Sequence, residues 1–315
     1  EGWLGAGFDR RLTMKTNPLP LVLWEDASIE AVVLPEAGIE VADMTMLQRI
    51  GREPKLPPYW KYVLSTDLDA GETVSWNDGK GFEPIGDERT PFTGEFDGQH
   101  HTIHRLHINR PDRDHVGLFS YLDNDGHVEN LSLIDIAVVG NSYVGGVAGT
   151  ISDGYLNYVC STGKVTGKVA VGGFVGEIQY LSAIRYGYSC GTVTGTEMVG
   201  GFAGYDMNGA LEYSYSLCSV TGESSVGGFA GHCAPSVIFE CYAAGLVTGG
   251  TGTGGFAGLG TGTYFLDFWD TTTTGQPSSA GGEGLSTDLM KQQASFPMWD
   301  FTNVWGIVEG RTYPY

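Results

Sequence analysis

The apolar and polar positions in the middle of the chain repeat with a period of 27 or 28 residues. Each period places a glycine pair or a close variant of it, in most copies after an apolar residue, and an aromatic or apolar residue and a small-Gly tail usually follow. A fixed repeat of this length is typical of a solenoid and not of a single globular core. The copies of the motif are residues 116–119, 144–149, 171–176, 199–204, 226–231 and 253–258.

The segments between the motifs are short, rich in Val, Thr, Tyr and Phe, and separated by Gly, which predicts strands and turns. One period is too small to bury its own apolar face, whereas stacked coils pair each strand with its copies at about 4.8 Å. We therefore predict an all-β fold, a right-handed parallel β-helix, over residues 61–275. A β-propeller would need about 40 to 50 residues per blade. The predicted inward ladder is Phe119, Val147, Phe174, Phe202, Phe229 and Phe256.

Both ends of an open β-helix need a cover, and short helices are predicted at each. Residues 39–60 predict a capping helix and a linker, with Met46, Leu47 and Ile50 on one helical face. Residues 276–315 predict a loop, a short helix over 287–295 and a C-terminal cap. The cap is rich in aromatic residues: Phe296, Trp299, Phe301 and Trp305.

Several segments carry a family resemblance. The VGGFAG tails, residues 62–69 (YVLSTDLD), residues 82–86 (FEPIG) and residues 92–103 (FTGEFDGQHHTI) resemble the GLUG-motif proteins, as does the closing segment 290–305. The resemblance covers the chain from about Ala42 to its end. It implies a secreted or surface-located bacterial protein with this architecture, and it supplies no common catalytic residues.

Residues 1–38 do not follow the repeat, and they resemble the second half of an internalin-type B-repeat, a small β-rich module. A sheet made of this half alone would lack partner strands. We expect it to lie along the flank of the helix or to pair with strands of another chain.

The chain has 37 acidic and 17 basic residues and a formal charge of −20. Such a surface repels nucleic acid and anionic lipid, so neither is an expected partner. The sequence has no apolar run long enough for a membrane span, so membrane insertion is not expected. No signal peptide is found, which fits a mature or trimmed secreted chain.

Five cysteines lie within the repeats: Cys160, Cys190, Cys218, Cys233 and Cys241. Counted from the upstream glycine pairs, Cys190 and Cys218 are equivalent and within reach of a disulfide. Counted from the downstream pairs they differ by one residue and face opposite sides. The sequence leaves this bond open, beside the alternative of buried free thiols.

Six of the seven histidines cluster in the first coils, together with several arginines. His104, His107 and Arg105 are the candidate catalytic residues, because Arg and His can neutralise a uronate while a Tyr or His takes its proton. A shared metal would require a corner between His104 and His107, which are three residues apart. A solvated surface is the plainer interpretation of the cluster.

Acidic residues suggest one further site. Asp123, Asp125 and Glu129 form part of a calcium-loop pattern without its full spacing, so calcium is the one candidate cofactor. Pairs such as Asp67 with Asp69 have the spacing that glycosidases need, but such pairs also arise by chance in an acidic chain.

Tyrosines recur at the coil spacing, and Tyr188, Tyr215 and Tyr242 are predicted to form one line along the helix. Outward rings would be a platform for sugars, and inward rings would belong to the core. The candidate partners are therefore glycans, neighbouring proteins or further copies of this chain.

The sequence favours an extracellular structural or adhesive β-solenoid module of a bacterial surface or matrix protein. A polysaccharide lyase or glycoside hydrolase on one flank of the helix is an alternative that rests on fold analogy. A self-assembling filament subunit is a third, because residues 17–33 place apolar residues on one face of their predicted strands.

The filament hypothesis makes a prediction about size in solution. If the strands of residues 17–33 pair with another copy, the full chain should assemble as its concentration rises, and removal of residues 1–38 should abolish the assembly. Light scattering on both proteins measures this. Monodisperse monomers of both at high concentration would rule the filament out.

Overall fold

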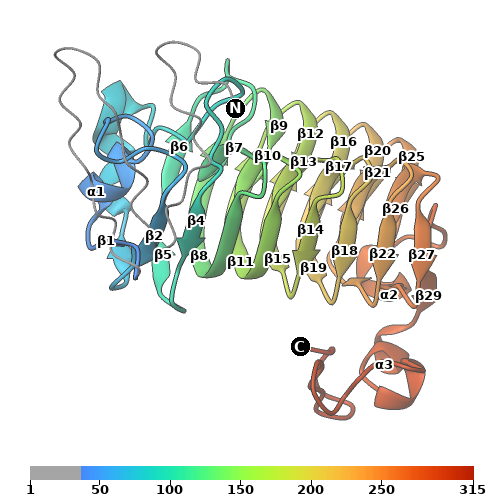
Figure 1. Ribbon diagram of the computed structural model, residues 1–315. Helices are drawn as coiled ribbons and strands as arrows, with labels where there is room; N and C mark the ends of the chain where they lie inside the picture. Colours follow the sequence, from blue (N-terminus) through green and yellow to red (C-terminus); the bar gives the residue numbers. More distant parts are fainter. Residues whose placement is uncertain (1–36) are drawn as a thin grey trace, which may run out of the picture. The chain divides into compact units, whose positions relative to one another are not determined.

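The computed structural model describes residues 37–315, which belong to one compact unit that begins at Pro35. Three parallel sheets run along this unit, and each coil contributes strands at the same positions as the coil before it (Figure 1). The prediction of a parallel β-helix is confirmed. The B-repeat-like strands predicted in residues 17–33 lie outside the described residues.

Each sheet is built from strands one coil apart. Sheet B consists of β7 (Phe119–Asp123), β10 (Ala148–Ser152), β13 (Val175–Gln179), β17 (Ala203–Asp206), β21 (Ala230–Cys233) and β26 (Ala257–Gly260). Sheet C consists of β9 (Ser142–Val144), β12 (Val169–Gly172), β16 (Glu197–Gly200), β20 (Ser224–Gly227) and β25 (Thr251–Gly254). Sheet A, with 18 strands, consists of β1 (Ile39–Val41), β2 (Lys61–Leu64), β3 (Leu68–Asp69), β4 (Glu95–Asp97), β5 (Thr102–His104), β6 (His107–Asn109), β8 (His127–Val139), β11 (Tyr155–Thr166), β14 (Ala183–Arg185), β15 (Tyr188–Thr194), β18 (Ala210–Glu212), β19 (Tyr215–Thr221), β22 (Val237–Phe239), β23 (Tyr242–Ala243), β24 (Val247–Thr248), β27 (Thr263–Phe265), β28 (Phe268–Asp270) and β29 (Glu283–Leu285).

Helices are short and lie near the two ends of the solenoid. They are α1 (Met44–Arg49), α2 (Thr271–Thr274), α3 (Thr287–Met290) and the 3₁₀ helices η1 (Gly71–Gly79) and η2 (Gln293–Ser295). Asp43 caps α1, because its side chain accepts a hydrogen bond from the Met46 amide at 2.6 Å. Leu47 and Ile50 are buried and Met46 is half-buried against the same core, as predicted, and Met44 is buried with them. No helix in residues 37–315 is long and apolar enough to cross a membrane.

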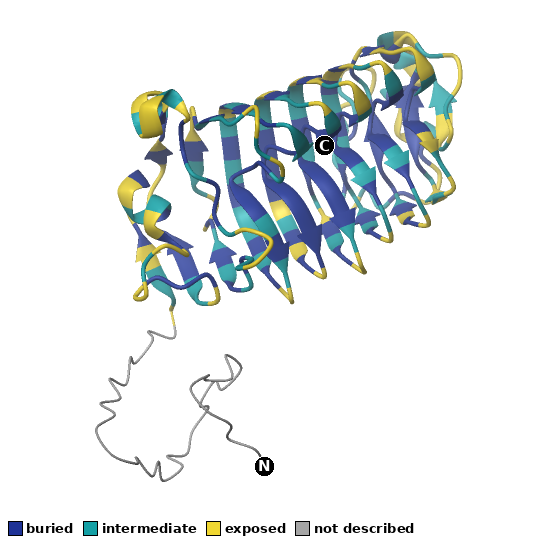
Figure 2. Cartoon of the chain, turned by 90° about the horizontal axis from the view of Figure 1, so that it is seen from above, coloured by how far each residue is buried: buried dark blue, intermediate teal, exposed yellow. Residues whose placement is uncertain are grey.

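The core is a column of apolar side chains enclosed by the three sheets, seen as the buried strands in Figure 2. Phe174, Phe202, Phe229 and Phe256 are fully buried and stack with ring centroids 4.5, 4.8 and 4.8 Å apart. This part of the predicted ladder is confirmed.

The predicted position of Phe119 in that ladder is wrong. Phe119 pairs with Ala148, which leaves Leu118 opposite Val147 at the ladder position. The motif of the first coil has one glycine fewer than the later motifs. Its aromatic residue, Phe119, therefore lies opposite the residue that follows the ladder position in the next coil. The Phe119 ring still points inward and packs against Phe92, with centroids 5.0 Å apart.

The C-terminal cover has two parts. β29 pairs with β28, and the Gly255 amide donates to the Ser278 carbonyl at 3.0 Å, so the segment predicted as a loop covers part of the last coil. The aromatic segment instead packs on the outer face of sheet A, where Tyr242 Oη donates to the Pro314 carbonyl at 2.6 Å. This second apolar cluster consists of Tyr242, Phe268, Met290, Phe296, Trp299 and Trp305.

The five cysteines are free thiols. Cys218 pairs with Gly191 and Cys190 pairs with Leu217, so counting from the downstream glycine pairs gives the correct register. Cys218 is buried, whereas Cys190 is half-buried. A disulfide between them is therefore excluded in this fold, since neighbouring positions of a strand face opposite sides.

Sheets B and C meet at their outer faces along a line that has room only for glycine. A Cβ atom on Gly149 would lie 2.4 Å from the carbonyl carbon of His115, and one on Gly176 would lie 2.3 Å from that of Tyr143. Side chains therefore cannot separate the two backbones here. We call this line the glycine seam. It is formed by Gly145, Gly149, Gly172, Gly176, Gly200, Gly204, Gly227, Gly231, Gly254 and Gly258.

The ladder gives the first stability prediction. Phe202→Ala should lower the free energy of unfolding by about 3–5 kcal/mol, because it leaves a cavity between two stacked rings. Asn208→Gly is the control, since Asn208 is exposed at a φ of 70° that glycine adopts freely. Denaturant melts measure both variants. Equal, small losses would contradict the assigned register.

Candidate functional site

The predicted catalytic residues lie on the outer face of sheet A near the N-terminal end. Arg105 has a φ of 59° and forms the required corner between His104 in β5 and His107 in β6. Its guanidinium forms an ion pair with Asp69, and Nε donates to Asp69 Oδ1 at 3.0 Å. His101 is similarly placed beside Asp67, with 3.2 Å between Nδ1 and Oδ1. The basic cluster is thus partly neutralised, and the catalytic role of His104, His107 and Arg105 stays a prediction.

The calcium candidates are spread over a turn and a strand. Asp123 Oδ1 accepts from the Asn124 amide at 2.9 Å, and Asp125 has a φ of 65° in the same turn. Glu129 lies within β8, with its Oε2 3.7 Å from Nε2 of His127. Within residues 37–315, no group of three or more His, Cys, Asp or Glu side chains is close enough to hold a metal. Calcium at Asp123, Asp125 and Glu129 stays a prediction.

The predicted tyrosine line exists on the outer face of sheet A. Tyr188, Tyr215 and Tyr242 stack with centroids 5.1 and 5.0 Å apart, which confirms the line itself. Because the rings lie face to face, they present mainly edges to solvent, and the C-terminal aromatic cluster buries Tyr242. Their role in binding stays a prediction. A second stack runs beside the first and consists of Tyr158, Tyr186 and Tyr213.

A different set of side chains lies directly above the glycine seam. Sheet C and its preceding corner supply His115 and Tyr143, and sheet B supplies Tyr121, Thr150, Glu177 and Tyr205. On sheet B these residues are in register from coil to coil, since Thr150 pairs with both Tyr121 and Glu177. We call this set the seam cluster: His115, Tyr121, Tyr143, Thr150, Glu177 and Tyr205.

Hydrogen bonds link three members of the seam cluster. His115 Nδ1 lies 2.7 Å from Thr150 Oγ1, and the Thr150 hydroxyl donates to Glu177 Oε2 at 3.3 Å. The hydroxyl then accepts the proton of Nδ1, which leaves Nε2 of a neutral imidazole as an acceptor. Burial lowers the pKa of His115 and favours that neutral form. Burial also raises the pKa of Glu177, against the opposing effect of hydrogen bonds from Gln179 and Thr150.

Aromatic rings follow the seam. His115 stacks on Tyr143 with centroids 4.7 Å apart and contacts Tyr121 at 5.4 Å. Further along, Tyr205 and His232 lie 5.3 Å apart in the same row of sheet B. The tyrosines of this row are half-buried, so their rings are fixed in place and remain accessible at one side. Burial raises the pKa of Tyr121 to about 12, which keeps its hydroxyl protonated as a donor.

The sequence analysis missed the seam cluster, although the repeat contains its signal. Thr150, Glu177 and Tyr205 each follow directly after a motif, and Tyr143 directly precedes one. Because the glycine seam has no room for side chains, the side chains on this face come from the residues on either side of the seam. The flanks of the motif, rather than the motif itself, therefore hold the variable surface of this face.

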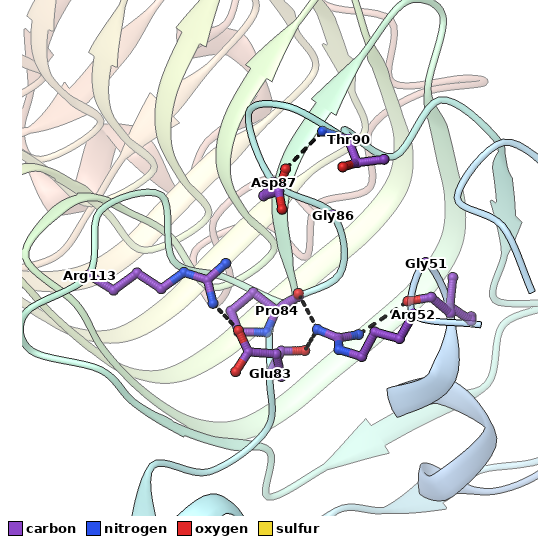
Figure 3. A pocket seen from close by; sticks show the side chains of 9 residues that line it. Gly51, Arg52, Glu83, Pro84, Gly86, Asp87, Thr90 and Arg113 are labelled. Atoms are coloured by element: carbon purple, nitrogen blue, oxygen red, sulfur yellow. Dashed lines mark hydrogen bonds and ion pairs between the residues drawn. The ribbon is translucent and has the colours of Figure 1, made fainter. Parts of the chain in front are cut away.

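A hollow of about 260 Å³ lies at the N-terminal end of the same face. Figure 3 shows Arg52 and Arg113 reaching Glu83 and Pro84 from opposite sides. We call it the arginine hollow. It is lined by Ile50, Gly51, Arg52, Glu83, Pro84, Gly86, Asp87, Thr90 and Arg113.

Arg52 and Glu83 of the arginine hollow are each bound by several other groups of the chain. Arg52 donates to four carbonyls, those of Gln48, Ile50, Glu83 and Pro84, and so ties the α1 region to the first coil. Its pKa is lowered by burial. Glu83 is held by both Arg113 and Arg110, the latter at 2.6 Å.

The hollow and the seam cluster are neighbours along the solenoid. A Cβ on Gly86 would lie 3.1 Å from the Tyr121 carbonyl, and that carbonyl accepts from the Phe92 amide at 2.9 Å. Arg113 precedes His115 by two residues. The loop that walls the hollow therefore lies against β7, the first strand of sheet B.

Carboxyl groups also occur inside the last coils. Asp206 is fully buried in the column that holds Ile178 one coil earlier. Its Oδ1 accepts from the Gly209 amide at 3.0 Å, while Oδ2 has no partner in the part of the chain that the structure describes. Burial raises its pKa to about 7.

Comparisons with known proteins find relatives in sequence and in structure. No protein-family model matches the chain. Halomucin of Haloquadratum walsbyi is 39% identical over 193 residues, which are 58% of this chain and 2% of halomucin. A "Putative Gly-rich membrane protein" of Evansella cellulosilytica is 44% identical over 55 residues, which are 18% of this chain and 6% of that protein. The chain thus spans only a small part of either relative.

Among solved structures, a crystal structure from Bacteroides ovatus described as a "putative immunoglobulin A1 protease" is similar, with a TM-score of 0.58. The match covers 78% of this chain and 84% of that one at 19% sequence identity. A likeness at this identity shows the fold alone. This chain is a parallel β-solenoid.

Asp206 predicts a pH dependence of stability. Because its folded pKa is raised from about 3.9 to about 7, folding takes up a proton between these values, and stability is lost as pH rises through that window. The loss is at most about 4 kcal/mol. Asp206→Asn should therefore stabilise the protein at pH 8 and change little at pH 4, as measured by denaturant melts.

The control is Asp112→Asn at an exposed position. It should keep the pH dependence of the unaltered protein. The same dependence in the Asp206 variant would show that this carboxyl is ionised at no cost in the folded state.

Proposed function

We propose that this chain is a rigid extracellular module of a longer surface polypeptide, and that it adheres by binding glycans along the seam cluster. The observation that carries the proposal is the row of aromatic and hydrogen-bonding side chains fixed above the glycine seam at one per coil. The row continues from Tyr121 through Thr150, Glu177 and Tyr205 to His232.

The role of a surface module is supported by the relatives, the charge and the architecture. One relative is named halomucin and another is named as a membrane protein, and a surface polypeptide fits both names. The formal charge of −20 keeps an elongated solenoid soluble and separated from other acidic surfaces. The solenoid also suits a spacer, because each coil contacts only its neighbours and adds length without a new core.

Glycan binding is supported by the spacing and the chemistry of the row. Coils repeat at about 4.8 Å, close to the length of one sugar unit in an extended polysaccharide. Tyrosine and histidine rings offer apolar surface to sugar rings, and the tyrosine hydroxyls offer hydrogen bonds to sugar hydroxyls. Thr150 and Glu177 are buried and hold the His115 ring in place from below. Because stacking and burial fix these side chains in advance, little conformational entropy would be lost on binding.

A lyase is the second candidate, and one observation favours it. A neutral His115 and a protonated Tyr121 lie beside the cationic Arg113 segment, and β-elimination needs a base, an acid and a group that neutralises the carboxylate. A hydrolase has less support, because Glu177 is the one carboxylate of the seam cluster and glycosidases use two.

The proposal predicts which tyrosines matter for binding. Tyr205→Ala should weaken the affinity for a bound glycan about tenfold, or about 1.4 kcal/mol, because it removes the ring that extends the row past Glu177. Calorimetric titration with glycans selected on an array measures this. Release of unsaturated ends during the titration would identify the lyase instead.

The matched control is Tyr155→Ala. Tyr155 is 40% exposed on sheet A and lies outside the seam cluster. Its loss should leave the affinity unchanged. Equal weakening by both variants would place the contact elsewhere, and no binding to any glycan would favour a neighbouring protein as the partner.

A further inference from the structure

We infer that the arginine hollow binds the carboxylate of an acidic sugar and so marks one end of the seam cluster as the place for a uronic acid unit. This inference deepens the proposed function and rests on it for the glycan chain that continues along the seam. The hollow itself is a separate set of residues with its own geometry.

Charged side chains surround the hollow. Three guanidinium groups, those of Arg52, Arg110 and Arg113, surround Glu83 and leave Asp87 as the second carboxylate of the hollow. Asp87 Oδ1 is already engaged by the amides of Arg89 and Thr90 at 2.9 and 2.8 Å. Within the lining, Arg52 and Arg113 balance Glu83 and Asp87, and Arg110, which pairs with Glu83 from outside the lining, adds one positive charge beside the hollow. On a protein whose formal charge is −20, this balance suits a monoanion better than a dianion.

Arg113 and Thr90 keep hydrogen-bond donors for a ligand. Arg113 bonds to Glu83 through Nη1, and its Nε and Nη2 have no acceptor among residues 37–315. Nε and Nη2 form the edge of a guanidinium that pairs with a carboxylate through two parallel hydrogen bonds. The Thr90 hydroxyl also lines the hollow and makes no hydrogen bond within the described residues, so it can bond to a ring hydroxyl.

The hollow has room for one sugar unit and lies beside the seam cluster. A volume of about 260 Å³ lies just below the usual range of small-ligand sites, about 300–1,000 Å³, and suits a single sugar unit. The loop that carries Gly86 packs on the backbone of Tyr121, so a chain that leaves the hollow meets the seam cluster directly. The rim carboxylates of Glu83 and Asp87 can accept hydrogen bonds from the hydroxyls of the sugar.

The test uses the whole chain and monosaccharide probes. NMR of ¹⁵N-labelled arginine side chains, recorded with glucuronate, galacturonate, galactose, acetate and sulfate, reports directly on the Arg113 Nε–H group. A saturable shift of the Arg113 signal with a uronate, at least tenfold weaker with acetate and sulfate and absent with galactose, is expected. Equal shifts with acetate, sulfate and the uronates would overturn the assignment to an acidic sugar.

Variants of Arg113 separate the effect of its two parallel N–H donors from the effect of its positive charge. Arg113→Gln should weaken uronate binding at least tenfold, and Arg113→Lys, which keeps the charge without the two-pronged edge, should bind more weakly than the unaltered protein. Arg185→Gln is the control, because Arg185 pairs with Glu212 on sheet A at 2.9 Å. Unchanged binding in Arg113→Gln would refute the inference.

The Tyr205→Ala variant separates this inference from the proposed function. Uronate binding that survives in Tyr205→Ala, beside loss of longer neutral glycans, supports both sites as separate contacts. If Arg113→Gln does not fold, the comparison of Arg113→Lys with the unaltered protein still decides the matter. Equal uronate affinity of those two would count against a bidentate carboxylate contact.

Discussion

The contact between the backbones of sheets B and C is the constraint on which the rest of the structure depends. A Cβ at these positions would lie well inside van der Waals distance of main-chain atoms, so the repeat needs glycine at both sides of the seam. The close contact turns each strand of sheet C sharply into the following strand of sheet B. That turn directs the aromatic residue of the motif inward, where it stacks on its copies at 4.5 to 4.8 Å.

The same constraint places one residue per coil in the left-handed backbone region beside the seam, including Tyr143 and Met198 with φ values of 57° and 53°. A residue other than glycine in this region carries a conformational cost of about 1–3 kcal/mol. Parallel hydrogen bonding and stacking of identical neighbours offset that cost coil by coil. The tyrosine stacks on sheet A follow the same logic, because their ring faces are used for contact with each other.

Function on a scaffold of this kind falls to the residues that the repeat does not fix. Above the seam these are His115, Tyr143 and Tyr205, which differ from the residues of other coils and therefore can recognise a ligand that differs along its length. The arginine hollow interrupts an acidic surface at the point where the first regular strand of sheet B begins. The inferred polarity of a bound glycan, with its acidic unit at the hollow, follows from this arrangement of charge.

The sequence by itself determined the parallel β-helix, the coil length and the inward Phe174 to Phe256 ladder, because stacking in register makes every coil repeat the same pattern. It misplaced Phe119 by one residue, since one glycine fewer in the first motif changes the register without changing the composition. The line of Tyr188, Tyr215 and Tyr242 was predictable, but its cover by the C-terminal aromatic cluster was not.

Only the tertiary structure decided the site. Arg52, Glu83 and Arg113 come from segments about 30 residues apart, and His115 meets Thr150 and Glu177 only because the glycine seam closes two sheets onto each other. Such contacts depend on how coils of different length and content are folded at the N-terminal end. A repeat pattern specifies which residues are equivalent, whereas the three-dimensional packing specifies which of the variable residues touch.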